Sequence, residues 1–115
     1  MTGEVKVPTV SIYPPSEEEL KTNSATIVCT ASNYLPRSAT MEFLVDGQKQ
    51  TNGVYTSSVT KQSDSSYMGS SFLTMTSSDY NKYKEYSCKV THQGKEFIQI
   101  LKRDRSVSNI QFTDW

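Results

Sequence analysis

Residues 85–94 read Glu-Tyr-Ser-Cys-Lys-Val-Thr-His-Gln-Gly, and this stretch carries the clearest structural pattern in the chain. Tyr86, Cys88 and Val90 alternate with polar residues, which is typical of a β-strand with one buried face. Residues 24–31, Ser-Ala-Thr-Ile-Val-Cys-Thr-Ala, alternate in the same way and place Cys29 on an apolar face. Each cysteine therefore lies inside a predicted strand and points toward a predicted core.

The two cysteines are the only ones in the 115 residues, and they lie far apart along the chain. Thiolate metal sites usually use closely spaced cysteine pairs, which this sequence lacks. Two distant cysteines on inward faces favour one disulfide in an oxidising compartment, which would stabilise the fold by about 4 kcal/mol. Two buried free thiols are the alternative at this point.

Short strand signals separated by turn residues continue in both directions along the chain. Two helical turns are predicted between them, at 16–20, where Ser16 and Glu19 have the capping-box spacing, and at 78–83. Seven short strands without an internal repeat are typical of an all-β sandwich. The predicted strands are residues 10–12, 24–31, 40–45, 54–60, 68–76, 85–91 and 96–101.

Length and charge exclude several classes of protein. A chain of 115 residues with 35% hydrophobic residues can build one modest core. Lys plus Arg and Asp plus Glu both number 12, so there is no basic excess for nucleic acid or an anionic membrane surface. No apolar run approaches the roughly 20 residues of a membrane span, and residues 1–7 lack the apolar segment of a signal peptide.

Candidate catalytic residues are scarce. His92 is the only histidine and follows a predicted strand next to a turn, where a surface or hydrogen-bonded role is favoured over that of a base for Ser or Cys chemistry. A metal site would lack a second histidine, and the glycines stand singly rather than in a phosphate-binding loop. The sequence therefore predicts no enzyme, no cofactor, no metal and no small-molecule substrate.

The spacing of Tyr86 and Cys88 is that of the tyrosine corner of immunoglobulin domains. From this point the chain resembles an immunoglobulin light-chain constant domain, a C1-set domain, over about residues 7–105. The segments that carry the resemblance are Pro8–Leu20 (Pro-Thr-Val-Ser-Ile-Tyr-Pro-Pro-Ser-Glu-Glu-Glu-Leu), Ala25–Cys29, Asn33–Pro36 (Asn-Tyr-Leu-Pro), Ser70–Thr76 and Tyr86–Gly94.

The resemblance implies a seven-stranded C1-type β-sandwich with Greek-key topology and two short helical turns. Residues 1–6 become a linker, 7–105 the domain and 106–115 a C-terminal tail. It also implies a disulfide between Cys29 and Cys88 that packs against Phe43 and Tyr86, and a cis peptide bond between Leu35 and Pro36.

The sequence combines features of both familiar light-chain types and departs from the family at two points. Residues 10–12 and 46–47 are similar to kappa chains, whereas 16–20, 61–63 and 92–94 are similar to lambda chains, which suits a non-mammalian vertebrate. Phe43 replaces the family's buried tryptophan, and the only tryptophan is Trp115. Ser106 stands where a light chain has the cysteine that bridges to the heavy chain.

Some apolar residues should point away from the core. If Cys29 and Leu73 face inward, strand alternation turns Val28 and Phe72 outward. In an immunoglobulin sandwich the strands concerned share one sheet. The predicted partner-binding face comprises Tyr13, Val28, Thr30, Met68, Ser70 and Phe72, with Glu18 and Glu19 at its rim. A second outward set on the other sheet, Leu44, Ile98 and Ile100, is read as ordinary surface.

The resemblance implies an antibody light-chain constant domain that pairs with the first constant domain of a heavy chain and stabilises the antigen-binding arm. Such a chain is secreted or lies on the B-cell surface, and a variable domain would precede residue 1. The alternative is a self-associating or receptor-type immunoglobulin-like module that forms a homodimer without a heavy chain. The run at 14–20 and the outward apolar residues favour the light chain, whereas the missing terminal cysteine favours the alternative.

Overall fold

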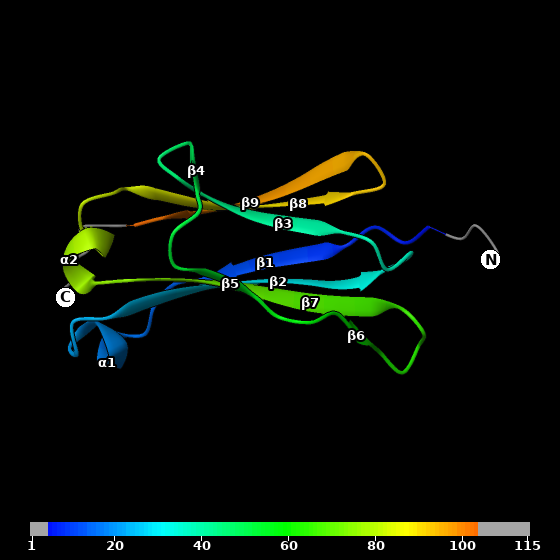
Figure 1. The fold of residues 1–115 in the computed structure, drawn as a ribbon, viewed down its shortest axis with the longest axis horizontal. Coiled ribbons are helices and arrows are strands. Elements are labelled where there is room, and N and C mark those ends of the chain that lie inside the picture. The colour runs from blue at the N-terminus through cyan, green and yellow to red at the C-terminus, as the bar shows by residue number, and fades with distance from the viewer. Residues whose placement is uncertain (1–4, 104–115) are drawn as a thin grey trace, which may run out of the picture.

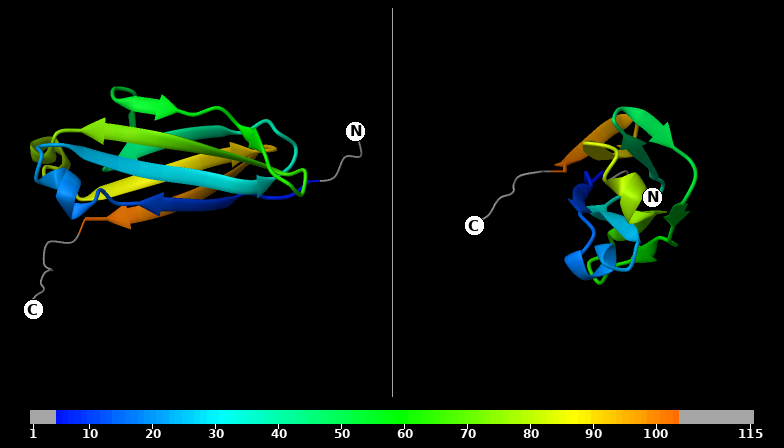
Figure 2. Two further views of the ribbon diagram at one scale, coloured as in Figure 1. Left: turned by 90° about the horizontal axis from the view of Figure 1, so that it is seen from below. Right: turned by 90° about the vertical axis from the view of Figure 1, so that its left-hand side faces the viewer.

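The computed structural model describes residues 5–103, which form two antiparallel sheets packed face to face (Figure 1). Two one-turn helices, α1 and α2, lie at one end of the sandwich, and the chain enters at the other end (Figures 1 and 2). In chain order the elements are β1 (Thr9–Tyr13), α1 (Glu17–Leu20), β2 (Ala25–Tyr34), β3 (Thr40–Val45), β4 (Gln48–Gln50), β5 (Val54–Thr56), β6 (Thr60–Lys61), β7 (Tyr67–Met75), α2 (Ser77–Tyr80), β8 (Glu85–His92) and β9 (Lys95–Lys102).

Strand order shows that the chain crosses repeatedly between the two sheets. The first sheet has the order β1-β2-β7-β5, with β6 also paired to β7, and the second has the order β4-β3-β8-β9. The central pairs β2–β7 and β3–β8 join strands that are distant in the sequence, as in a Greek-key sandwich. The predicted all-β sandwich fold is therefore confirmed.

The core lies between the sheets and follows the alternation read from the sequence. Every second residue is buried from Ala25 to Ala31 in β2 and throughout β8, whereas the residues between them are half-buried. Cys29 and Cys88 are disulfide-bonded with a Cα–Cα distance of 6.2 Å, which links β2 to β8 across the two sheets. The free-thiol alternative is thereby excluded.

Phe43 and Tyr86 lie beside this disulfide in the buried core. Phe43 is opposite Cys88 in the β3–β8 ladder and is 1% exposed, so a phenyl ring occupies the place of the family's indole. The buried Tyr86 hydroxyl donates to the Tyr80 carbonyl oxygen at 2.7 Å. Burial raises the pKa of Tyr86 strongly, which keeps the phenol protonated as a donor. This bond ties α2 to β8.

The helical turns are close to their predicted positions. Ser16 caps α1 by accepting the Glu19 amide hydrogen at 3.1 Å, as its spacing predicts. The second helix is Ser77–Tyr80 and not 78–83, because the Thr76 side chain caps it by accepting from the Asp79 amide. In each case a hydroxyl side chain sets the start of the helix.

The described residues contain nine strands, two more than predicted. β4 was missed because its three residues, Gln-Lys-Gln, have no apolar alternation. The predicted strand at 54–60 is divided into β5 and β6, which both pair with β7. Between them, Ser57 still donates its amide hydrogen to the Ser70 carbonyl oxygen at 2.8 Å.

The ends of two elements differ from the prediction. β2 continues to Tyr34 and does not give way to a turn at residue 33, because Asn33 adopts a φ of 64° and forms a bulge within the strand. Lys6, predicted to lie in a linker, exchanges backbone hydrogen bonds with Leu35 at 3.1 and 3.0 Å.

The peptide bond between Leu35 and Pro36 is cis, as the resemblance implied. The predicted tail at 106–115, including Ser106 and Trp115, lies outside the described residues.

Candidate interaction face

Four apolar side chains form one continuous row across the outer face of the first sheet. In the strand ladders Tyr13 is opposite Val28, Val28 is opposite Phe72, and Phe72 is opposite Tyr55. The Tyr55 and Phe72 rings lie 6.1 Å apart between centroids. Side chains directly opposite in neighbouring strands face the same side of a sheet. The row therefore crosses β1, β2, β7 and β5 on the side away from the core.

The rows next to it are neutral and mostly hydroxylic. Thr30 lies opposite Ser70, and further along β7 Met68 lies opposite Ser32 and Thr60. Met68 is 37% exposed, Tyr13 is 52% exposed and Phe72 is half-buried. The predicted face is thus brought together on one sheet, with two aromatic rings and a methionine accessible to a partner. For convenience we call the residues Tyr13, Val28, Thr30, Tyr55, Met68, Ser70 and Phe72 the apolar face.

Tyr55 was not predicted, although it is the most exposed large apolar residue of the face at 66%. The sequence gives only a weak strand signal there. Tyr55 lies beside Phe72 because β5 pairs with β7, which is a long-range pairing. Gly53 makes this pairing possible, because a Cβ there would lie 2.5 Å from the Thr74 carbonyl oxygen. The Thr74 amide in turn donates to the Gly53 carbonyl at 2.9 Å. A glycine next to a strand was the signal that could have indicated close backbone approach.

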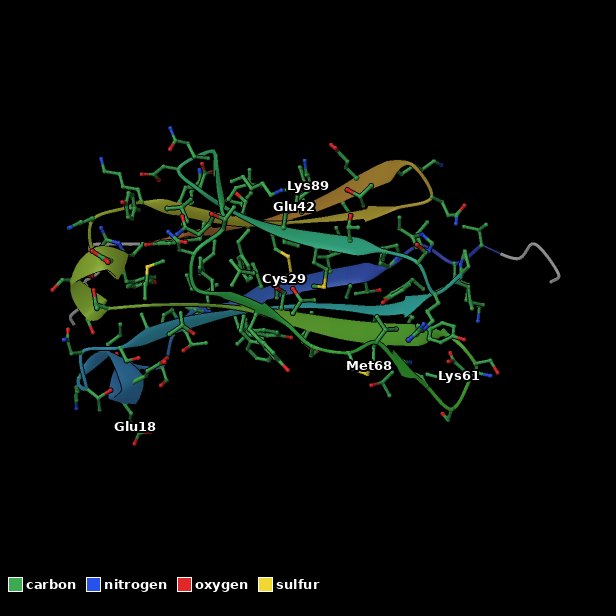
Figure 3. All side chains as sticks on the ribbon, viewed as in Figure 1. Glu18, Cys29, Glu42, Lys61, Met68 and Lys89 are labelled. Atoms are coloured by element: carbon green, nitrogen blue, oxygen red, sulfur yellow. A yellow bond between two sulfur atoms is a disulfide. The ribbon has the colours of Figure 1, made fainter. Side chains whose placement is uncertain are left out.

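The two predicted rim glutamates differ in their environments. Glu18 is exposed on α1, whereas the carboxylate of Glu19 turns back onto β2 and accepts from both the amide (3.0 Å) and the hydroxyl of Thr26. Glu19 therefore holds α1 on the sheet. It is not the freely available rim charge that the sequence predicted. Figure 3 shows Glu18 at the α1 end of the first sheet and Met68 and Lys61 toward the other end.

The second sheet has a different outer face. Glu42 on β3 forms ion pairs with Lys49 at 3.2 Å and Lys89 at 3.4 Å, and Lys89 also reaches Glu96 at 3.5 Å. The lysines beside Glu42 hold the pKa of that carboxyl below its ordinary value. Of the second outward set, Ile98 and Ile100 are about half exposed and Leu44 is partly buried.

Of the two roles expected for His92, the hydrogen-bonded one is found and the surface one is not. The ring is buried, packs edge-on against Tyr34 at 5.4 Å between centroids, and its Nε2–H donates to the Pro36 carbonyl oxygen at 3.1 Å. Nδ1 has no hydrogen-bond partner among the described residues. The ring thus supports the turn after β2 through its contacts with Tyr34 and Pro36.

Other kinds of site were searched for within residues 5–103. No group of three or more His, Cys, Asp or Glu side chains there could hold a metal ion. No helix in the same range is long and apolar enough to cross a membrane. An open hollow is lined by Asp46, Lys84, Glu85, Lys102 and Arg103, and Asp46 already accepts hydrogen bonds there from the backbone amides of Lys84 and Glu85.

Comparison with known families agrees with this geometry. Residues 10–95 match the family model of the immunoglobulin C1-set domain. The match covers most of the chain, including both cysteines, Tyr86 and, apart from Thr9 at the start of β1, every strand of the first sheet. The protein therefore belongs to the immunoglobulin C1-set family. Domains of this family are generally binding modules rather than enzymes, and they typically pair with other immunoglobulin domains.

Proposed function

We propose that this chain is an antibody light-chain constant domain whose apolar face pairs with the first constant domain of a heavy chain. The pairing would stabilise the heavy-chain domain and complete the antigen-binding arm. The observation that carries the proposal is the row Tyr13–Val28–Phe72–Tyr55, which spans four strands of one sheet. Isolated exposed apolar residues are ordinary, but a continuous aromatic row on one face is typical of a partner surface.

The charge distribution supports the same use of this face. None of the ion pairs among residues 5–103 involves an outward residue of the first sheet. A face of apolar and hydroxyl side chains can lose its water without desolvating ionised groups, which would be costly. Exposed Glu18 and Lys61 lie at opposite ends of the face, where partial hydration keeps charged contacts weak.

The proposal includes an extracellular location, either secreted or as part of membrane immunoglobulin on a B cell. Its support is the buried disulfide between Cys29 and Cys88, since such bonds form and persist in oxidising compartments. The light-chain motifs at residues 8–20 and 86–94 support the specific assignment, and the mixture of kappa-like and lambda-like segments suits a lineage distant from mammals.

Pairing can be measured directly with purified domains. We expect the chain to form a one-to-one complex with a heavy-chain first constant domain in sedimentation velocity. Replacing Phe72 with Ala should weaken this complex by about 2 kcal/mol, because Phe72 lies near the centre of the row. An unchanged affinity in a folded Phe72→Ala protein would place the partner surface elsewhere.

A homodimeric or receptor-type module is the second candidate, and one observation favours it. Both cysteines of the 115 residues are used in the internal disulfide, so none of these residues can form a covalent bridge to a heavy chain. The two candidates differ in the partner chosen by the same face. If the chain alone dimerises through Phe72 and a heavy-chain domain does not compete, the module is favoured. Competition by the heavy-chain domain favours the light chain.

A further inference from the structure

Among residues 5–103, the edge of the second sheet is a long strand, β9, with no strand hydrogen-bonded to its outer side. β9 has eight residues, ends the order β4-β3-β8-β9, and makes no ladder with β1, the nearby strand of the other sheet. Ile98 and Ile100 on this strand are 48% and 52% exposed. A long edge strand is a template for pairing with another strand, because half of its backbone groups lack partners.

The direction of these backbone groups follows from the β8–β9 ladder. The Arg103 amide donates to the Lys84 carbonyl oxygen at 2.7 Å, and the register continues without a bulge from that pair to His92 and Lys95. Hydrogen-bonded pairs alternate along an antiparallel ladder. The backbone groups of Phe97, Gln99 and Leu101 therefore point to β8, and those of residues 96, 98, 100 and 102 point to the free edge.

The order of side chains along β9 is complementary to itself. An antiparallel copy of the strand, related by a two-fold axis at Gln99, places Glu96 opposite Lys102 and Ile98 opposite Ile100. The same axis places Phe97 opposite Leu101, so the inward-facing apolar residues also match. The residues brought opposite each other at Glu96/Lys102 and Ile98/Ile100 are those with free backbone groups, and each such pair can exchange two hydrogen bonds.

From this match we propose that the β9 edge is a self-association site, where a second copy of the chain adds its own β9 antiparallel across a two-fold axis. The product is one continuous eight-stranded sheet, formed by two copies of the second sheet. Such a contact is isologous, so each favourable pair occurs twice. The apolar face is on the other sheet and is left free, which separates this site from the proposed pairing with a heavy chain.

Charges on the edge are arranged for this register. The Glu96 side chain is 57% exposed while it contacts Lys89, so it has room for a second ammonium group. Lys102 is exposed and makes no ion pair with another described residue. The next pair in this register would be Lys95 opposite Arg103. The Arg103 guanidinium group already donates to the carbonyl oxygens of Tyr83 and Asn81 in its own chain, each at 2.8 Å.

Neighbouring registers lose these matches. A shift of one residue sets inward side chains against outward ones, because side chains alternate along a strand. Moving the axis from Gln99 to Ile98 places Glu96 opposite Ile100, and moving it to Ile100 places Ile98 opposite Lys102. The axis at Gln99 thus combines opposite charges, matched isoleucines and free backbone groups.

Charge reversal tests the register in the full chain. Sedimentation equilibrium over a range of concentrations should show a monomer–dimer equilibrium for the parent. Lys102→Glu and Glu96→Lys should each weaken dimerisation roughly tenfold, because each creates two like-charge pairs. The double variant, Glu96→Lys with Lys102→Glu, should regain most of the affinity, although it loses the contact between Glu96 and Lys89.

A cross-link tests the axis independently. Residues opposite each other in a non-hydrogen-bonded pair have Cα atoms about 4.5 Å apart, within the range of a disulfide. Gln99→Cys should therefore form a covalent dimer under mild oxidation, since the native cysteines are already bonded. Ile98→Cys is the matched control. In this register residue 98 lies opposite residue 100 of the second copy and not opposite residue 98, so this variant should cross-link much more slowly.

Four results would overturn the proposal. A parent that stays monomeric at all concentrations excludes the site. A dimer whose affinity is unchanged by Lys102→Glu, or a double variant no tighter than the single ones, excludes the register. A dimer that is lost in Phe72→Ala but kept in the charge variants assigns self-association to the apolar face, and this result would leave the proposed pairing function intact.

Discussion

The outer faces of the two sheets differ in the polarity of the side chains that they expose to water. On the first sheet a row of apolar side chains crosses four strands and is flanked by serine and threonine. On the second sheet Glu42 forms the centre of an ion-pair chain with Lys49 and Lys89, which continues to Glu96. Both faces are built on strands with the same inward alternation. A continuous apolar row is therefore found on the first sheet only, whereas on the second sheet the exposed Ile98 lies opposite the ion-paired Lys89.

This difference indicates which of the two outer faces a partner can cover. Removing water from an apolar and hydroxylic surface is favourable, whereas removing it from a chain of ion pairs desolvates every charged group in the chain. Leu44 and Val28 occupy comparable places, each partly buried in a central strand. Their neighbours distinguish them, since Val28 lies between Tyr13 and Phe72 while Leu44 lies between Lys49 and Ser87.

The largest effect should come from placing a charge in the apolar row. Val28→Glu puts a carboxylate between two aromatic rings, and we expect pairing with the heavy-chain domain to weaken by at least about 3 kcal/mol. Leu44→Glu is the matched control on the other face and should leave pairing unchanged. Titration calorimetry measures both affinities, and circular dichroism checks the folds. Equal losses in the two variants would contradict the contrast between the faces.

A smaller effect is expected at the edge of the row. Tyr55 is 66% exposed and its ring lies tilted beside that of Phe72, so Tyr55→Ser should weaken pairing by about 1 kcal/mol with little change in the free energy of unfolding. The same binding assay measures it, next to thermal melts of the free chain. A loss larger than that of Phe72→Ala would move the centre of the interface from β7 to β5.

On the outer face of the second sheet, replacing Glu42 should lower the stability of the fold without changing the affinity for the heavy-chain domain. The folded-state pKa of Glu42 lies below its ordinary value of 4.5 because of Lys49 and Lys89. Its contribution is therefore complete above pH 4.5 and is lost as the pH falls through the lowered pKa. Glu42→Gln should reduce the free energy of unfolding at pH 7 by less than about 1 kcal/mol.

Urea unfolding at several pH values checks this prediction. The difference between the parent and Glu42→Gln should shrink as the pH falls below 4.5, and 1 M salt at pH 7 should shrink it as well. A difference that is constant with pH would show that the ion pairs of Glu42 do not stabilise the fold. Unchanged affinity for the heavy-chain domain is expected throughout.

The smallest effect is expected at the rim of the apolar face. Glu18 is exposed on α1, so Glu18→Gln should change pairing by a few tenths of a kcal/mol, and the change should disappear at high salt. Binding measured at two ionic strengths tests this. Glu19→Gln should instead lower the stability of the free chain, because Glu19 binds the backbone of Thr26. A large, salt-independent effect at Glu18 would place it inside the interface.

Much of the fold could be predicted because it depends on local alternation. The inward positions of Cys29, Tyr86 and Cys88 follow from the two-residue period of a strand, and the start of α1 follows from the Ser16 cap. Short polar strands could not be predicted in this way. β4 has no apolar period, and it is a strand because β3 offers its backbone groups at that edge.

The sequence by itself determined which residues face inward, which cysteines could meet and which apolar residues are left over, since these depend on spacing along one strand. Tertiary structure alone decided that Tyr55 joins the row, that Glu19 turns back onto Thr26, and that His92 is buried against Tyr34. Each of these contacts joins two different elements, and those of Tyr55 and His92 join residues far apart in the sequence. Their partners are selected by the packing of the whole sandwich, and no local pattern encodes that selection.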